Sequence, residues 1–306
     1  MDLRPIVLPD NSTYIAAFLT FNCQLRCPYC INFHGDDLIK NRRLSGKDWI
    51  KGLNRLVTRP NLPITLQGGE PTVHKNFYEI VDGVKTESRL ELLTNLEIDI
   101  TKFRSLVPAH RFMRGDGYPA IRVSYHHGQS DFENLVDKVL HLSRRGYSIA
   151  IWEVGHPDFI VDVAKRKHLA KQLGVDYRIK EFLGPWKGKN YGTMGYPDAV
   201  NSGRLRSCEC RTSELLIAPD GNIFRCHSDL YSGRGPIGNI LDPEPPELGQ
   251  WRHCSVFGKC NSCDIRVQAK PYKAVGHTSV EIKNISTPQG ITTPNNTVRN
   301  TYGKTS

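Results

Sequence analysis

The chain has 306 residues, of which 39% are hydrophobic and 9% aromatic, which is the composition of a globular protein with a full core. No stretch approaches the roughly 20 apolar residues of a membrane span, and the start lacks the apolar segment of a signal peptide, so we expect a cytoplasmic protein with no membrane partner. The formal net charge of +10 suggests nucleic acid, but the basic residues are dispersed and no aromatic residues alternate with them, which argues against such a partner.

The first part of the chain alternates between strand and helix patterns. Short apolar runs predict six strands, and the stretches between them have the apolar spacing of helices. We expect strands at 14–21, 63–67, 90–94, 121–125, 148–154 and 177–183, and helices at 46–56, 77–84, 100–107, 132–142 and 159–173. Repeats of this length predict an α/β fold with a parallel sheet and right-handed crossovers.

A cysteine motif follows the first predicted strand. Cys23, Cys27 and Cys30 are separated by three and then two residues on one short loop. Thiolates are the ligands that iron–sulfur clusters require, and this spacing can hold three irons of a [4Fe-4S] cluster while the fourth iron stays open. A zinc knuckle or three structural cysteines is the alternative.

A glycine-rich turn, Gly-Gly-Glu-Pro at 68–71, follows the second predicted strand. Its two glycines allow the backbone to come close to a ligand, and Glu70 supplies a carboxylate. In this order, the cysteine loop and the turn resemble the radical S-adenosylmethionine (SAM) superfamily. The resemblance implies a partial (β/α)6 TIM-like barrel, and a [4Fe-4S] cluster on the three cysteines whose open iron binds the amino and carboxylate groups of SAM.

The resemblance also implies roles for residues near the strand ends. Glu70 and the backbone near Gly68 and Gly69 would receive the amino end of SAM, and Tyr29 would lie beside the adenine. Polar residues at the ends of later strands are further candidates for contact with SAM or substrate, because chemistry in parallel barrels lies at the carboxyl ends of the strands. These are Thr94, Asn95 and Ser124, the last matching a hydroxyl that the family uses near SAM, and His126, Glu153 and Lys180 as catalytic candidates.

The segment 185–206 is rich in glycine and poor in aliphatic residues, which predicts an irregular linker or a loop that covers the substrate. Trp186, Tyr191 and Tyr196 either line the active site or pack the linker against the barrel. Beyond it, two short strands at 213–218 and 222–226 flank Pro-Asp-Gly, which is typical of a hairpin turn.

Six further cysteines lie in the region of this hairpin. Their order around a glycine turn resembles the auxiliary-cluster region of the twitch and SPASM subgroup of radical SAM enzymes, and it implies one auxiliary [4Fe-4S] cluster. Cys208 and Cys210 both stand where the first ligand is expected, Cys210 being preferred, and Cys254 is left over. A structural zinc site uses the same four-thiolate geometry. The ligands that the resemblance implies are Cys210, Cys226, Cys260 and Cys263.

These features predict four regions: a radical SAM barrel at 1–184, the linker at 185–206, a small cysteine-rich auxiliary-cluster domain at 207–283 and a mobile tail at 284–306. The expected function is that of an oxidoreductase that cleaves SAM, takes a hydrogen atom from its substrate and passes a second electron to the auxiliary cluster. A flavodoxin or ferredoxin would supply the first electron. The substrate would be a small molecule rather than a peptide, because the first strand starts too early for a leading peptide-binding domain.

Two other functions stay open from the sequence. One is a redox-neutral epimerase, in which a protein thiol returns the hydrogen atom, and the spare Cys208 or Cys254 could do so. The other is a zinc-stabilised nucleic-acid-binding protein, which only the net charge and the Cys-x-x-Cys pair favour.

Overall fold

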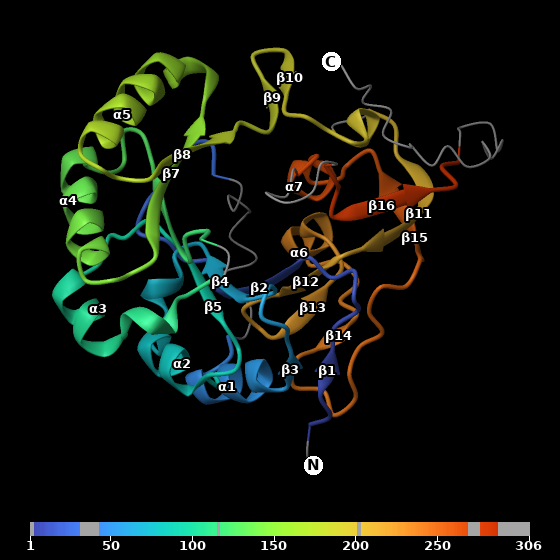
Figure 1. Ribbon diagram of the computed structural model, residues 1–306. Helices are drawn as coiled ribbons and strands as arrows, with labels where there is room; N and C mark the ends of the chain where they lie inside the picture. Colours follow the sequence, from blue (N-terminus) through green and yellow to red (C-terminus); the bar gives the residue numbers. More distant parts are fainter. Residues whose placement is uncertain (1–2, 31–42, 115–116, 201–202, 269–275, 287–306) are drawn as a thin grey trace, which may run out of the picture.

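The computed structural model describes residues 3–30, 43–114, 117–200, 203–268 and 276–286, and Figure 1 labels its elements. Within these residues the largest sheet has nine strands, in the order β14-β13-β12-β2-β4-β5-β6-β7-β8. Six of them are parallel and neighbour one another in chain order: β2 (Tyr14–Thr20), β4 (Ile64–Gly68), β5 (Leu90–Thr94), β6 (Ile121–Tyr125), β7 (Ile149–Gly155) and β8 (Tyr177–Glu181). The predicted α/β fold with a mainly parallel sheet is therefore confirmed.

Helices cover one face of this sheet, which we call the helix face (Figure 1). They are α1 (Gly46–Asn54), α2 (Phe77–Gly83), α3 (Ile100–Leu106), α4 (Phe132–Ser143) and α5 (Ile160–Gln172). Asp131 caps the start of α4, because its side chain accepts a hydrogen bond from the backbone N–H of Asn134. Alternate residues of each strand, such as Ile15 and Ala17 of β2, are fully buried in the hydrophobic core on this face. Hydrophobic burial therefore holds helices and sheet together.

The other face of the sheet, the inner face, carries polar groups near its centre. Tyr14 donates a hydrogen bond to Gln67 at 3.1 Å, and Thr65 donates one to Glu91 at 2.9 Å. Arg122 of β6 forms an ion pair with Glu91 of β5 at 2.8 Å, and both side chains are buried. These partners satisfy polar groups that would otherwise be costly to bury, so the inner face tolerates charged side chains.

The predicted hairpin is present but belongs to the main sheet. Its strands are β12 (Glu214–Ile217) and β13 (Asn222–Phe224), and β14 (Gly238–Asn239) pairs with β13 at the sheet edge. β12 lies parallel to β2, with Glu214 opposite Tyr14. The expectation that this hairpin belongs to a separate small domain is thus wrong, because Leu215 and Leu216 are buried on opposite faces of the sheet and need cover on both sides.

A second, smaller sheet carries several of the cysteines. Its central strand β11 (Arg206–Thr212) lies between β15 (Arg252–Phe257) and β16 (Val280–Lys283). The short helices α6 (His227–Ser232) and α7 (Ser262–Ile265) lie between this sheet and the main one (Figure 1). The cysteine-rich part is therefore packed directly on the inner side of the main sheet.

The remaining described elements are short. β1 (Ile6–Val7) pairs with β3 (Leu56–Val57), and the predicted irregular linker contains a small hairpin of β9 (Gly184–Trp186) and β10 (Lys189–Tyr191). Most of the predicted tail, from residue 287 on, lies outside the described residues. Among the helices described, none has the length and apolar character to cross a membrane.

Glu153, a catalytic candidate in the sequence, lies on the helix face instead of the inner face. Its carboxylate receives hydrogen bonds from the guanidinium of Arg166 on α5, one at 3.0 Å, and from the hydroxyl of Tyr177 on β8. Side chains alternate between the faces of a strand, so Glu153 points away from neighbours such as Trp152. Its observed role is to tie α5 to the sheet.

Replacing Glu153 with Ala should lower the free energy of unfolding by about 3–5 kcal/mol, because Arg166 would be left buried without its partner. Thermal unfolding of the variant checks this, with exposed Glu87→Ala as the control that keeps the wild-type midpoint. A Glu153→Ala variant that unfolds like the wild type would contradict the structural role.

Candidate functional site

The first thiol group consists of Cys23, Cys27 and Cys30, on the loop that follows β2. The backbone N–H of Cys30 donates to the carbonyl of Cys27 at 3.1 Å, and the N–H of Leu25 donates to the sulfur of Cys23 at 3.4 Å. Burial, together with the charges of Cys30 and Cys23, raises the pKa of Cys27 to about 12. Thiols that oppose each other's ionisation fit a bound metal centre, whose positive charge stabilises the thiolate forms.

The glycine turn after β4 is clamped onto this cysteine loop. Gly69 N–H donates to the carbonyl of Thr20 at 2.7 Å, and Glu70 N–H donates to the carbonyl of Asn22 at 2.8 Å. Gly68 has φ of 148°, and a Cβ at Gly69 would lie 2.3 Å from the carbonyl oxygen of Asn22. The two glycines are thus required for the contact between the two loops, in addition to any contact with a ligand.

Glu70 is fully buried and joins the turn to the end of β5. Its carboxylate accepts hydrogen bonds from the hydroxyls of Thr72 (2.6 Å) and Thr94 (2.8 Å), and from the backbone N–H of Asn95 (2.7 Å). Burial raises its pKa, and these hydrogen bonds oppose that rise. Both carboxylate oxygens have protein partners, so Glu70 fixes the turn, and its contact with the amino group of SAM stays a prediction.

Asn95 connects this network to the first thiol group. Its side-chain amide donates to the sulfur of Cys23 at 3.6 Å, while its side-chain oxygen accepts from Gln24 at 3.3 Å. The structure therefore brings Thr94 and Asn95 together with Glu70 and Cys23. Ser124 lies two strands away from β4 on the inner face, where it is half-buried.

An aromatic group lies at the carboxyl ends of β6 and β7, next to the cysteine loop. Tyr29 stacks with His126 at 6.4 Å between ring centroids and contacts His156 at 5.4 Å. His156 also contacts Trp186 at 4.6 Å, so the linker reaches this site through Trp186. The sequence interpretation missed His156, although it follows the end of β7 just as His126 follows β6.

The pKa values of His126 and Lys180 are both lower than their ordinary values. Burial, together with the charge of Lys180, lowers the pKa of His126 to about 4, so the imidazole is neutral at pH 7. Burial and the charge of Arg122 lower the pKa of Lys180 to about 8. Because the charge of Lys180 acts on the pKa of His126, the two groups lie near one another on the inner side of the sheet.

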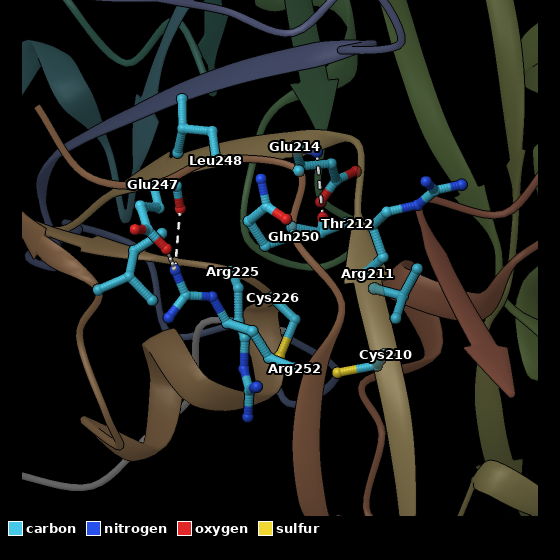
Figure 2. Close-up of a pocket in the computed structure, with 13 residues that line it drawn as sticks. Cys210, Arg211, Thr212, Glu214, Arg225, Cys226, Glu247, Leu248, Gln250 and Arg252 are labelled. Atoms are coloured by element: carbon cyan, nitrogen blue, oxygen red, sulfur yellow. Dashed lines mark hydrogen bonds and ion pairs between the residues drawn. The ribbon is translucent and has the colours of Figure 1, made fainter. Parts of the chain in front are cut away.

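The second thiol group lies against the small sheet, in one cavity. Cys208 stands opposite Cys254 in the pairing of β11 with β15, and the thiols of Cys208 and Cys210 donate hydrogen bonds to the sulfur of Cys254, which lowers its pKa. Figure 2 shows the sulfur atoms of Cys210 and Cys226 directed toward one another in the adjoining pocket. The five cysteines that line the cavity are Cys208, Cys210, Cys226, Cys254 and Cys260.

This group differs from the predicted ligand set at two positions. Cys254, which the sequence left over, lies between Cys208 and Cys210, whereas Cys263 is not among the residues that line the cavity. Cys263 instead influences the pKa of Lys180 on β8 and of Tyr231 on α6. The charges that act on its own pKa include those of Glu214 on β12 and Lys180 on β8, so it lies near the main sheet, which spacing alone does not reveal.

Comparisons with known proteins show which proteins the chain is similar to. No family model matches the sequence. The chain is 27% identical over 214 residues to molybdenum cofactor biosynthesis protein moc-5 of Caenorhabditis elegans, covering 62% of this chain and 33% of that protein. It is 24% identical over 263 residues to PqqA peptide cyclase of Ruegeria pomeroyi, covering 69% of this chain and 67% of that protein.

The fold has a counterpart among solved structures. The structure of polyhistidine-tagged anSMEcpe with bound AdoMet superposes with a TM-score of 0.52, at 15% sequence identity, over 78% of each chain. These relatives and this fold support the radical SAM superfamily. The chain spans about a third of the length of the nematode relative, so the activity of that whole protein is not transferred.

For a radical SAM protein, the residues present fit the expected groups. The first thiol group offers three thiol ligands beside two backbone-clamped loops, and the amide of Asn95 supplies a hydrogen bond to one sulfur, as outer contacts of cluster ligands commonly do. The second thiol group offers more than the four thiols that a closed cluster needs. Trp186 lies at the site, whereas the hydroxyl of Tyr196 accepts a hydrogen bond from Ile282 N–H and packs against the small sheet.

Replacing Glu70 with Gln should destabilise the protein and weaken SAM binding while the iron content stays unchanged. The neutral amide replaces charge-assisted hydrogen bonds, each worth roughly 1.5–3 kcal/mol, and it presents N–H groups to the donors around it. Thermal unfolding, iron analysis and equilibrium dialysis of SAM measure the three quantities. The exposed Glu87→Gln is the control, and wild-type stability of Glu70→Gln would show that the network is dispensable.

Proposed function

We propose that the protein is a radical SAM oxidoreductase that cleaves SAM reductively and takes a hydrogen atom from a carbon of its substrate. The observation that supports it most is the clamp between the cysteine loop and the glycine turn, made by Gly69 and Glu70. It holds three thiols beside the ends of two parallel strands, where ligands bind in folds of this kind.

The first thiol group would hold a [4Fe-4S] cluster through Cys23, Cys27 and Cys30. With SAM, this cluster supplies the electron and the carbon radical that the reaction needs. The protein positions the ligands: Tyr29, with His126 and His156 behind it, offers an aromatic surface for the adenine. Ser124 and Lys180, on the inner face, would lie beside SAM or substrate.

The second thiol group would hold an auxiliary [4Fe-4S] cluster. We infer that Cys226, Cys254 and Cys260 are ligands together with either Cys208 or Cys210, because all of these side chains line one cavity. A cluster whose four ligands are thiolates has no open iron and serves electron transfer. Removal of one hydrogen atom and one electron from the substrate is then a net two-electron oxidation.

A redox-neutral epimerase is the second candidate, and the position of Cys263 favours it. The thiol lies outside the second thiol group and influences Lys180 and Tyr231, while Tyr231 is also influenced by Cys30 of the first group. Cys263 would thus lie toward the inner face of the main sheet, where an epimerase would need a thiol that returns a hydrogen atom to the substrate. Cys208 and Cys254, the donors expected from the sequence, lie in the thiol cavity instead.

The partners follow from this proposal. The substrate would be a small molecule or a peptide, since one relative is by its name a cyclase of the PqqA peptide. A flavodoxin or ferredoxin would deliver the first electron, and the location would be the cytoplasm, where thiols stay reduced.

Changing Cys23, Cys27 and Cys30 together to Ala should remove about four iron atoms per chain and abolish formation of 5′-deoxyadenosine. The fold should persist, because the sheet and its helices have their own core. Iron analysis and chromatography of SAM products on anaerobically purified protein measure both effects. Retained SAM cleavage would refute the radical SAM mechanism, as would a colourless wild-type protein that contains zinc in place of iron.

Cys254→Ala and Cys263→Ala form a matched pair for the auxiliary cluster. We expect Cys254→Ala to lose up to about four iron atoms, because it removes the central thiol of the cavity, and Cys263→Ala to keep the wild-type iron content. Iron analysis and the absorbance near ~400 nm separate the two. If Cys263→Ala loses iron and Cys254→Ala keeps it, the ligand set expected from the sequence is the correct one. If Cys263→Ala keeps its iron and SAM cleavage but no longer transfers deuterium from D2O to the product, the epimerase replaces the oxidoreductase.

A further inference from the structure

A cluster of three metal-ligating side chains lies between the main sheet and the small sheet. Glu214 begins β12, His227 begins α6 and Asp264 lies on α7, so three separate elements bring them together. One ligand atom from each lies within 4.8 Å of the other two. The side chains are nearly inaccessible, with exposed fractions of 4% for Glu214, 10% for His227 and 2% for Asp264. The triad contains no cysteine and is therefore distinct from both thiol groups.

One distance within the triad matches that of atoms that share one metal ion, and the other is that of a hydrogen bond that an ion would replace. Nδ1 of His227 lies 2.8 Å from Oδ1 of Asp264 and 3.4 Å from Oε2 of Glu214. Ligands bound at about 2.0–2.2 Å to one first-row ion stand roughly 3.0–3.5 Å apart. The side chain of Asp264 is already oriented, because it also accepts the backbone N–H of His227 at 3.0 Å.

The charge of the triad is not balanced by its own members. If His227 is protonated, it neutralises one carboxylate, and the triad keeps a net charge of −1 in a buried place. Oε2 of Glu214 accepts no hydrogen bond, although it is buried and directed at the imidazole. An unpartnered buried carboxylate oxygen is costly. A divalent cation would offset the carboxylate charges beyond what the nearby charge of Arg266 does, and it would give this oxygen a partner.

We propose that Glu214, His227 and Asp264 bind one divalent transition-metal ion. One imidazole and two carboxylates suit Mn²⁺, Fe²⁺ or Zn²⁺, whereas iron–sulfur clusters take thiolates. Water would complete the coordination. The ion ties β12 of the main sheet to α6 and α7, which carry the cysteine-rich part. The site does not depend on the proposed radical chemistry, because none of its ligands is a thiol.

A titration with Mn²⁺, followed by the loss of the free Mn²⁺ signal in electron paramagnetic resonance, tests the site. Mn²⁺ is chosen because it prefers oxygen and nitrogen ligands and leaves thiols unoccupied. It is added to the anaerobically purified holoenzyme with oxidised clusters. We expect one Mn²⁺ per wild-type chain, and at least tenfold weaker binding by Glu214→Gln with unchanged iron content. The matched control is Glu209→Gln, a half-exposed carboxylate on β11 near Lys283, which should bind as the wild type does.

A second variant covers the case in which Glu214→Gln does not fold. Asp264→Asn keeps an oxygen that can accept the N–H of His227, so α6 should form, but it removes one charge from the triad and should also weaken Mn²⁺ binding at least tenfold.

Mn²⁺ should raise the thermal midpoint of the wild type but not of either variant, because only the binding-competent folded state gains from the ion. If the wild type takes up no Mn²⁺, or if both variants bind it like the wild type, the proposal is wrong. Neither result would affect the iron or SAM measurements, so the two proposals fail independently.

Discussion

The contact between two loops, one after β2 and one after β4, governs the rest of the candidate site. Gly69 and Glu70 donate backbone hydrogen bonds to the carbonyls of Thr20 and Asn22, just before the first cysteine. No other residue type fits at Gly69, because a Cβ there would overlap the backbone of Asn22. Glu70 then extends the contact to β5 through Asn95 N–H, so the ends of three neighbouring strands become one unit.

This unit explains how a short loop of polar residues can present thiols in a fixed arrangement. The sulfur of Cys23 receives hydrogen bonds from Leu25 N–H and the side chain of Asn95, and both donors belong to the unit or adjoin it. Thiolates held close together repel each other, and burial opposes their charge as well. The binding energy of a metal cluster must overcome both effects, and a preformed support reduces the ordering that binding requires.

The sequence predicts the local elements well and the long-range contacts poorly. Apolar runs bounded by turns locate β5 and β6 without error, because the core-facing residues of those strands are buried and need little context. The parallel pairing of β12 with β2 joins Glu214 to Tyr14 across most of the chain, which no local pattern reveals. Glu153 was misjudged because the face to which a strand residue points depends on the pleat, and its partner Arg166 on α5 is identified only in three dimensions.

At the candidate site, too, the sequence predicts which cysteines are close neighbours along the chain but not which ones meet through long-range contacts. Spacing on a short loop identifies the first thiol group, because its members are close neighbours in the sequence. Cys254 belongs to the second group because β15 pairs with β11 in the register that sets it opposite Cys208, and a register cannot be read from cysteine counts. Cys263, on the short helix α7, does not line the cavity of the second thiol group, although it stands in the Cys-x-x-Cys pair that suggested a ligand.

The helix α6 sets where a substrate can lie in the proposed enzyme. Cys226 of the second thiol group precedes its first turn, and Tyr231 near its end contacts Phe21 of the loop that carries the first thiol group. The side chains of Phe18 and His227 pack between these ends, so the direct path along β2 and β12 is filled. In the proposed enzyme, the substrate would then lie on the other side of α6, toward β6 and β8. There Ser124 and Lys180 face the inner side, and Cys263 is the thiol whose charge reaches Lys180. If the proposed auxiliary cluster accepts an electron from the substrate, that electron would pass by α6 and α7, and the packing of these two short helices on the main sheet would then matter to the proposed reaction.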